Sequence, residues 1–324
     1  MHSIEQYRED FLSYMETKIA TKEPKNLYEP ITYILGLGGK RLRPVLTLMS
    51  AEIFGADYKK AFDAALAIEV FHNFSLVHDD IMDEAPLRRG KETVHKKWDV
   101  NTGILSGDAM LIYSYQLFES YPPQAFKELM HLFSQTAMQV CEGQQYDVDF
   151  EERDDVSIPE YLRMIAYKTA VLVAAAMKMG AIIAETREDS QDLIYDFGKN
   201  LGIAFQLQDD YLDAFGDPKT FGKQVGGDII ENKKTFLYLK ALEMGSPEQK
   251  RELEHLFSIK PQDAAHKIAT VKELFVDTNA VTRTLQEIED YTEKAFKTLE
   301  LLNVSEDKKQ LLRAFGTSLM QREV

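Results

Sequence analysis

Two clusters of aspartates carry the strongest chemical signal in the sequence. Each has the form Asp-Asp-x-x-Asp and closes an apolar segment that is predicted to be helical; together they comprise Asp79, Asp80, Asp83, Asp209, Asp210 and Asp213. Residues four apart lie on one face of a helix, so the first and last aspartate of each cluster share a face. Such carboxylates are costly unless they are paired or bind metal, and Mg²⁺ combines few carboxylates with substrate phosphates. The clusters therefore predict a divalent-metal site for a phosphorylated ligand.

A glycine-rich basic segment lies at the start of another predicted helix. It reads Gly38-Gly39-Lys40-Arg41-Leu42-Arg43-Pro44 and places three cations within four positions. Pro44 suits the first turn of a helix. The backbone N–H groups and the dipole at a helix N-terminus favour an anion, as do the cationic side chains. This segment is therefore a candidate site for phosphate.

Further basic residues follow each aspartate cluster. Arg88-Arg89-Gly90 begins five residues after Asp83, and arginine forks match diphosphate oxygens better than lysine point charges do. Lys168-Thr169 lies in an apolar segment, where a charge is costly without an anion. The basic residues after the second cluster are Lys223, Lys233 and Lys234. The chain thus combines two acidic poles with several basic ones.

The order of these motifs resembles that of the trans-isoprenyl diphosphate synthases, also called polyprenyl synthetases. The shared motifs are Gly-Lys-Arg-Leu-Arg-Pro, Asp-Asp-x-x-Asp followed by Arg-Arg-Gly, Lys-Thr, and Phe-Gln-Leu-Gln-Asp-Asp at 205–210, and they span roughly residues 36 to 240. The resemblance implies a single large all-α helical bundle with a central substrate cavity. It also implies head-to-tail condensation of isopentenyl diphosphate with an allylic diphosphate.

The resemblance also implies roles for the aspartates. Asp79 and Asp83, with Asp209, would hold three Mg²⁺ ions that bind the allylic diphosphate. Asp80 and Asp213 would be weaker or indirect ligands, and Asp210 belongs to the same metal site. No side-chain nucleophile is needed, because the allylic C–O bond ionises and the double bond of isopentenyl diphosphate attacks the cation.

Two substrate sites follow from the same resemblance. The residues expected at isopentenyl diphosphate are Gly39, Lys40, Arg43, His72 and Arg89. Those expected at the allylic diphosphate and the reacting carbons are Arg88, Lys168, Thr169, Gln206, Lys223 and Lys233, with Lys234 as an alternative to Lys233. Arg41 is as readily a surface arginine as a ligand. The remaining central histidines, His78, His95 and His131, are expected to be structural.

Product length depends on side chains that precede the first aspartate cluster. Phe74 and Phe71 lie five and eight residues before Asp79, which corresponds to about 7.5 and 12 Å along a helix. Either ring could stop the growing tail; core packing of both rings is the less favoured alternative. With the small Ser75 next to Phe74, the pattern resembles the geranylgeranyl type, and the predicted product is C15 to C20 with C20 favoured.

Three rival functions are open at this point. A terpene cyclase shares the first aspartate motif, but its second metal motif normally carries Asn, Ser or Thr, and Glu, and it has no use for the Gly-Lys-Arg segment. A non-catalytic partner subunit of a synthase usually loses an aspartate motif, whereas both are intact here. A calcium-binding structural module is disfavoured because neither cluster lies in a glycine-bearing calcium loop.

Composition limits the class of protein. Among 324 residues only 17 are glycine and 10 proline, which favours a helical chain. The net charge of −15 argues against nucleic acid and against an anionic membrane surface. Cys141 is the only cysteine, and no signal-like or membrane-spanning apolar run is found, so we expect a cytoplasmic protein without stable membrane insertion. The family resemblance implies a homodimer.

The apolar periodicity predicts a chain of helices within one domain, 1–324. The predicted helices cover about 4–21, 25–37, 41–54, 58–83, 102–119, 123–148, 158–184, 189–215, 232–243, 247–257, 261–275, 279–301 and 306–320. Segment 85–101 is predicted to be a loop. Residues 245–324 are highly charged and are expected to form a peripheral helical cap of the same domain.

Overall fold

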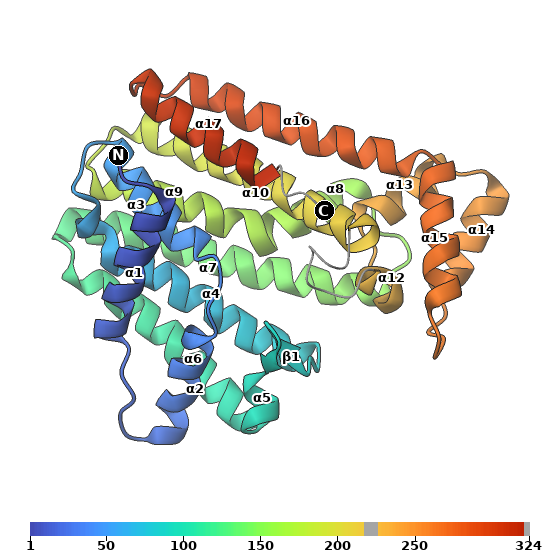
Figure 1. Cartoon of the computed structure of the whole chain (residues 1–324), viewed down its shortest axis with the longest axis horizontal. Coiled ribbons are helices and arrows are strands. Elements are labelled where there is room, and N and C mark those ends of the chain that lie inside the picture. The colour runs from blue at the N-terminus through green and yellow to red at the C-terminus, as the bar shows by residue number, and fades with distance from the viewer. Residues whose placement is uncertain (217–225, 321–324) are drawn as a thin grey trace. The chain divides into compact units, whose positions relative to one another are not determined.

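The computed structural model describes residues 1–216 and 226–320, and this part of the chain is almost entirely helical (Figure 1). The chain forms two compact units: Met1–Ser134 with Ala175–Asp192, called unit 1, and Gln135–Ala174 with Leu193–Val324, called unit 2. Within the described part of the chain, three helices have residues in both units: α7 (Pro123–Glu152), α9 (Val171–Ile183) and α10 (Glu188–Phe215). The all-α prediction is confirmed.

Unit 1 is organised around α4 (Phe62–Met82), as Figure 1 shows. The elements that pack on it include α1 (Ile4–Lys18), α2 (Lys25–Gly36), α3 (Leu42–Ile53), η1 (Tyr58–Ala61), α5 (Val94–Lys97), α6 (Val100–Gln116) and η2 (Leu117–Ser120). Every residue of α4 from Ala64 to Phe71 is buried. A helix that is apolar on all sides must be surrounded by others, which places the first aspartate cluster at the end of a rigid central helix.

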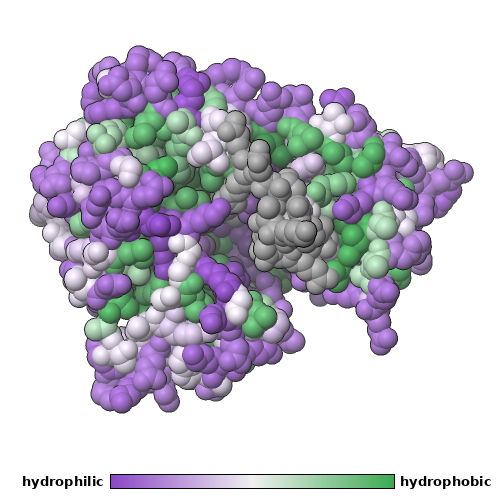
Figure 2. Space-filling view, in the orientation of Figure 1, coloured by the Kyte–Doolittle hydropathy of each residue, from purple (hydrophilic) through white to green (hydrophobic). Residues whose placement is uncertain are grey.

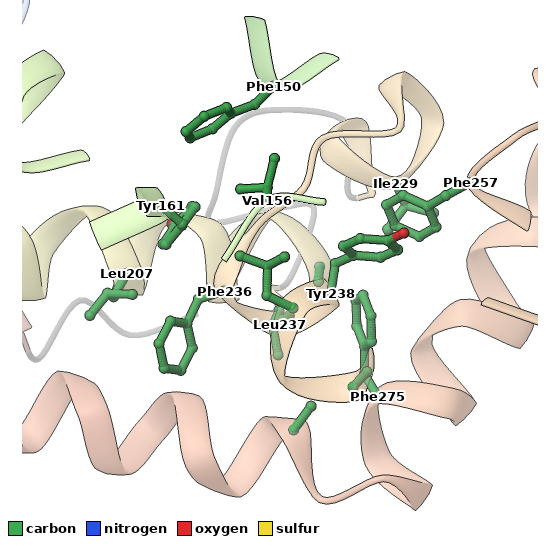
Figure 3. Packing of buried hydrophobic residues seen from close by; sticks show 14 of the residues in the cluster. Phe150, Val156, Tyr161, Leu207, Ile229, Phe236, Leu237, Tyr238, Phe257 and Phe275 are labelled. Atoms are coloured by element: carbon green, nitrogen blue, oxygen red, sulfur yellow. The ribbon is translucent and has the colours of Figure 1, made fainter. Parts of the chain in front are cut away.

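Unit 2 contains the π-helical turn η3 within its all-helical core. Its elements are α8 (Ile158–Ile165), η3 (Ala166–Ala170), α12 (Gly227–Glu231), α13 (Phe236–Met244), α14 (Pro247–Leu256), α15 (Ala265–Asp277), α16 (Ala280–Glu300) and α17 (Glu306–Met320). One hydrophobic cluster joins Tyr161 of α8 and Leu207 of α10 to Phe236 of α13 and Phe275 of α15 (Figure 3). The rings of Tyr238 and Phe257 pack with centroids 4.2 Å apart in the same cluster.

The C-terminal segment is part of this core. Leu253, Phe257, Val271, Phe275 and Ala280 all belong to the cluster that α8 and α10 enter. Outside the core, α14 and α15 carry a hydrophilic surface, which appears as the purple tip at the right of Figure 2. Residues 245–324 therefore combine a charged exterior with a structural role in unit 2. That the whole chain forms one domain stays a prediction.

The predicted helices are present, with three differences in detail. Segment 85–101 is not a plain loop: strands β1 (Leu87–Arg88) and β2 (Lys91–Glu92) form an antiparallel hairpin, and α5 follows it. The cause is the pair Arg89-Gly90, in which both residues have positive φ and form the two-residue turn that hairpins favour. The helix predicted at 232–243 begins only at Phe236, because Asn232 takes a left-handed conformation that ends α12.

The third difference lies in the helix predicted at 158–184. This stretch, Ile158–Ile183, is interrupted by the π-helical turn η3. Among the described residues it is also the one stretch long and apolar enough to cross a membrane, but 72% of its most apolar window is buried in the structure. Burial of that extent is typical of a core helix in a soluble protein.

Close packing of α9 on α3 in unit 1 generates a prediction. A Cβ atom at Gly180 would lie 2.6 Å from the backbone nitrogen of Ala51, and the Ser50 hydroxyl donates to the carbonyl of Met177 at 2.6 Å. Because backbone atoms of α3 would have to move, we expect Gly180→Ala to lower the free energy of unfolding by about 1–3 kcal/mol.

The control is Gly36→Ala at the exposed end of α2, where an added Cβ meets nothing within 4 Å. This variant should be neutral or slightly stabilising. The measurement is the midpoint of urea unfolding at unchanged slope. Equal midpoints for the two variants would contradict the close approach of these helices.

Candidate active site

A buried ion pair anchors the glycine-rich segment to α4. Arg41 has a left-handed backbone and donates to the carboxylate of Glu69 and to the carbonyl of Leu35. Asn73 Nδ2 donates to the same Glu69 carboxylate at 2.9 Å. Arg41 and Glu69 are only 4% and 2% exposed. The surface position considered for Arg41 from the sequence is therefore wrong, because its guanidinium is buried and holds the segment in place. A role for Arg41 in ligand binding stays a prediction.

Gly39 has a backbone conformation that favours glycine, and the end of the Arg89 side chain lies close to it. The backbone of Gly39 has φ +119°, and a Cβ there would lie 2.9 Å from Cζ of Arg89. Arg89, in the hairpin turn, donates to the carbonyl of Gly38. The hairpin and the glycine-rich segment therefore meet, as expected for two parts of one anion site.

Arg43 and His72 meet between α3 and α4. Arg43 Nη1 lies 3.2 Å from His72 Nε2. Burial lowers the pKa of His72 well below its usual value, and the charges of Arg43, Arg89 and Arg88 lower it further. The imidazole is therefore neutral and accepts the hydrogen bond from Arg43. The predicted residues Gly39, Arg43, His72 and Arg89 are thus brought together in unit 1, and Lys40 adjoins them on an exposed position of the same segment.

The aspartates of the first cluster lie in two different environments. Asp79 is half-buried and Asp83 is exposed at the C-terminus of α4. Asp80 is fully buried and its carboxylate accepts three hydrogen bonds from Arg88, with Nη2 to Oδ1 at 2.6 Å and Nε to Oδ1 and Oδ2 at 2.9 and 3.0 Å. Burial raises the pKa of Asp80, and the guanidinium of Arg88 opposes that rise. Asp80 therefore holds Arg88, while Asp79 and Asp83 lie on a different side of the helix.

The second cluster repeats this division. Asp210 is buried, and it accepts hydrogen bonds from the Tyr161 hydroxyl and from Gln206 Nε2, the latter at 3.0 Å. Burial raises the pKa of Asp210 to about 7 against the effect of these two donors, and the charges of Asp209 and Asp213 add to the rise. The middle aspartate is again held by protein groups, whereas Asp209 and Asp213 are only half-buried.

Thr169 and Lys168 lie on the π-helical turn. Thr169 Oγ1 donates to Gln206 Oε1 at 3.1 Å, which extends the network of Asp210 to this turn. The turn is packed between two glycines: a Cβ at Gly143 of α7 would lie 2.7 Å from Cα of Lys168, and one at Gly202 of α10 would lie 2.8 Å from Cα of Ala170. π-Helical turns occur preferentially at functional sites. Gly143 lies inside the helix predicted at 123–148, and a glycine within a helical pattern is the signal by which this close packing could have been found.

An acidic residue missed by the sequence reasoning joins two of the predicted lysines. Asp147 Oδ2 lies 2.6 Å from Lys168 Nζ and 3.7 Å from Lys233 Nζ. Lys234 instead donates to the carbonyls of Phe150 and Glu151 at 3.0 and 3.1 Å, at the C-terminal end of α7. Of the two alternatives, Lys233 is therefore the one beside Lys168. Lys223 lies outside the described residues.

The aromatic residues before the first cluster are packed differently from each other. Phe71 is fully buried, and its ring lies 5.2 Å from that of Phe133 and 5.4 Å from that of Phe74. Phe74 is 8% exposed and also contacts His78, with centroids 4.8 Å apart. The Ser75 hydroxyl donates to the carbonyl of His72 at 2.9 Å. Phe71 is thus a core residue, and Phe74 lies nearer to the aspartates.

The donor set fits magnesium completed by a phosphorylated substrate. Within residues 1–216 and 226–320, no group of three or more His, Cys, Asp or Glu side chains is close enough to hold a metal by itself. Asp79 and Asp83, like Asp209 and Asp213, offer pairs of carboxylates four residues apart. Two carboxylates per ion, with phosphate oxygens and water as the other ligands, are what Mg²⁺ takes at such sites.

The Arg41–Glu69 pair generates a prediction about stability. Glu69→Ala leaves the buried guanidinium of Arg41 without its counterion, so we expect the free energy of unfolding to fall by about 3–5 kcal/mol. The matched control is Asp192→Ala, which removes the carboxylate that pairs with Lys178 at 2.6 Å on the surface of the same unit. That loss should cost about 0–1 kcal/mol. The free energy of unfolding of both variants is measured in urea. If Asp192→Ala lowered it as much as Glu69→Ala does, burial of the Arg41–Glu69 pair could not be the reason for the loss.

The comparisons with known proteins agree with one another. The model of the family described as polyprenyl synthetase matches residues 24–275. A geranylgeranyl pyrophosphate synthase of Geoglobus acetivorans is 39% identical over 300 residues, covering 92% of each chain. A geranylfarnesyl diphosphate synthase of Natronomonas pharaonis is 34% identical over 338 aligned positions, covering 99% of this chain and 97% of that protein. A crystal structure of a geranylgeranyl pyrophosphate synthase matches with a TM-score of 0.97 and 57% identity over 100% of both chains. The chain belongs to the polyprenyl synthetase family.

Proposed function

We propose that the protein is a Mg²⁺-dependent prenyltransferase that condenses isopentenyl diphosphate with an allylic diphosphate head to tail and makes a C20 product. The observation that carries the proposal is the link between each aspartate cluster and the groups suited to diphosphate. Asp80 holds Arg88, and Asp210 holds Gln206, which in turn accepts from Thr169. Family membership and relatives named for geranylgeranyl diphosphate support the same reaction.

The outer aspartates are the proposed metal ligands. Asp79 and Asp83 on α4, and Asp209 and Asp213 on α10, would hold up to three Mg²⁺ ions together with the allylic diphosphate. Bound Mg²⁺ supplies positive charge that stabilises the departing diphosphate. In this proposal Asp80 and Asp210 orient Arg88 and Gln206 instead of binding metal, because both carboxylates are buried and already accept hydrogen bonds.

The cationic side chains are proposed to bind the two substrates. Arg88, Lys168 and Lys233 would hold the allylic diphosphate, and Lys223 would join them from outside the described residues. Thr169 and Gln206 would line the reacting carbons. Isopentenyl diphosphate would be held by the residues of the glycine-rich segment and their partners, which are Gly39, Lys40, Arg43, His72 and Arg89. Neutral His72 suits this site because it orients Arg43 without adding a titrating charge of its own.

The reaction then needs no nucleophile from the protein. The allylic C–O bond breaks and its electron pair leaves with the diphosphate, which the lysines and arginines stabilise. The double bond of isopentenyl diphosphate attacks the allylic cation and forms the new C–C bond. The departing diphosphate accepts the proton lost from the condensed cation. Apolar side chains must exclude water from the cation during these steps.

The rival functions account for fewer of these features. A terpene cyclase would have no role for the anchored glycine-rich segment, in which Arg41 and Arg89 both fix the backbone around Lys40. A non-catalytic subunit would not need an intact network from Asp210 to Thr169. The activity test distinguishes both rivals from the proposed function, because a cyclase would give a cyclic product and a non-catalytic subunit would give none.

We also propose a cytoplasmic homodimer. Ile104, Leu105 and Ile112 of α6 are 40%, 59% and 59% exposed, and their spacing places them on one side of the helix. An exposed apolar stripe of this kind marks a protein contact. A second copy of the chain is the partner that family membership favours. The single cysteine, Cys141, agrees with a reducing compartment.

Removal of a metal-binding carboxylate tests the proposed reaction. Labelled isopentenyl diphosphate, Mg²⁺ and primers of five, ten and fifteen carbons should give product with the wild-type chain. Asp79→Ala should lower turnover by several orders of magnitude, about 10³-fold or more, because charge on the leaving diphosphate is no longer stabilised. Asp277→Ala, at an exposed carboxylate that ends α15, is the control and should leave turnover unchanged. Turnover of Asp79→Ala within tenfold of wild type would refute the metal assignment, and a cyclic product would favour the cyclase.

The length of the product tests which side chain stops the growing prenyl tail, that is, which residue forms the floor of the substrate pocket. Phe74→Ala opens space near the aspartates, so its main product should lengthen beyond C20 by at least one five-carbon unit. Phe71→Ala removes a core ring, so we expect mainly a loss of stability of about 3–5 kcal/mol. Phe11→Ala, at a fully buried ring of α1, is the control for destabilisation alone and should not change product length. If Phe74→Ala and Phe71→Ala singly and together retain activity and the original product, the floor lies on another helix.

A further inference from the structure

Asp147 occupies an unusual electrostatic position on α7. Its side chain is 17% exposed, and one oxygen, Oδ2, faces the ammonium groups of both Lys168 and Lys233. Burial alone raises the pKa of a carboxyl group, but the two lysines more than offset this and lower the pKa of Asp147 below its usual value. Asp147 is therefore ionised whenever both lysines are charged, and the three groups carry a net charge of +1.

The two lysines come from different segments of unit 2. Lys168 is on the π-helical turn η3, and Lys233 is in the non-helical segment between α12 and α13. Two ammonium groups repel each other, so their approach requires a negative charge between them. Asp147 provides it, and Glu151, one helical turn further along α7, accepts a second contact from Lys233.

The segment that carries Lys233 is fixed from both sides. On one side Lys234 donates to the carbonyls of Phe150 and Glu151 at the end of α7. On the other side Lys267 of α15, which is only 2% exposed, donates to the side chain of Asn232. The backbone next to Lys233 is thus held in place, and its flexible side chain is directed by two carboxylates of α7, Glu151 at 2.5 Å and Asp147 at 3.7 Å.

We propose that Asp147 is a positioning residue that holds Lys168 and Lys233 as a pair for one diphosphate. The inference rests on the proposed function, in which both lysines bind the allylic diphosphate. An ammonium group has three donors, so each lysine can keep its contact with Asp147 and still donate to phosphate oxygens. The lysines are then already placed where negative charge develops as the C–O bond breaks. No group is transferred to or from Asp147.

Positioning and simple charge balance predict different effects of Asp147→Asn on kcat. If Asp147 only reduced the positive charge, its removal would strengthen binding of a diphosphate and leave catalysis intact. If it positions the lysines, kcat should fall by about 10- to 100-fold, because small displacements of such groups cost that much. The KM of the allylic primer should stay the same or fall, since a negative charge near the anion is lost. The KM of isopentenyl diphosphate should not change.

The test compares Asp147→Asn with Asp149→Asn. Asp149 lies on the same helix, is exposed and accepts a hydrogen bond from Gln145, so the control makes the same charge change away from the lysines. Wild type and both variants are assayed with a labelled primer and isopentenyl diphosphate, with inorganic pyrophosphate as a competing ligand. Thermal unfolding midpoints for all three check that the fold persists, which the isosteric change at Asp147 favours.

A second background separates positioning from a general loss of structure. In a chain that already carries Lys233→Ala, Asp147→Asn should lower kcat by a smaller factor, because one of its two partners is gone. An equal factor in both backgrounds would overturn the inference. So would an unchanged kcat with tighter pyrophosphate inhibition, or equal effects of Asp147→Asn and Asp149→Asn. Failure of the wild-type chain to transfer any primer is a different result and would overturn the proposed function itself.

Discussion

Successive residues of a helix are separated by about 100° around its axis. This constraint gives the outer and middle aspartates of each cluster different directions and different partners. The outer residues, four apart, share one side, and the middle residue must point elsewhere. In the first cluster the middle residue, Asp80, is buried against Arg88. In the second, Asp210 is buried against Tyr161 and Gln206. One short motif therefore presents two carboxylates and also fixes a neighbouring polar group.

This division explains why the sites depend on rigid helices. α4 is buried along most of its length, so the direction of Asp80 is set by the core of unit 1. In unit 2, Tyr161 belongs to the hydrophobic cluster that also contains Phe236 and Phe275, so the donor to Asp210 is placed by packing. The C-terminal helices contribute through the same cluster and through Lys267, although none of their residues belongs to a sequence motif. The core thus orients the polar groups that the proposed chemistry requires.

The sequence was sufficient to predict most of the helices, and it supplied the candidate site residues, whose roles stay predictions. Long apolar periods predicted nearly every helix, because burial of one face or of all faces leaves a pattern within a single segment. Pairings between distant segments leave no such pattern. The contact of Arg41 with Glu69 joins residues 28 apart, and that of Lys168 with Asp147 joins residues 21 apart. The π-helical turn and the hairpin were missed for a related reason, since Gly143 and the Arg89-Gly90 turn act through backbone geometry.

The hairpin of β1 and β2 affects the distance at which two bound ligands are held from each other. Arg88 and Arg89 are neighbours, yet the first reaches the carboxylate of Asp80 and the second reaches the carbonyl of Gly38. Arg88 ends strand β1 and Arg89 begins the two-residue turn, so the backbone conformation of the hairpin sets where the two side chains diverge. Under the proposed function, the distance between the two diphosphates is then set by a molecular spacer one peptide bond long. Such a spacer cannot be lengthened gradually: an inserted residue would move one arginine away from its partner, so we expect insertions and deletions in this turn to be poorly tolerated.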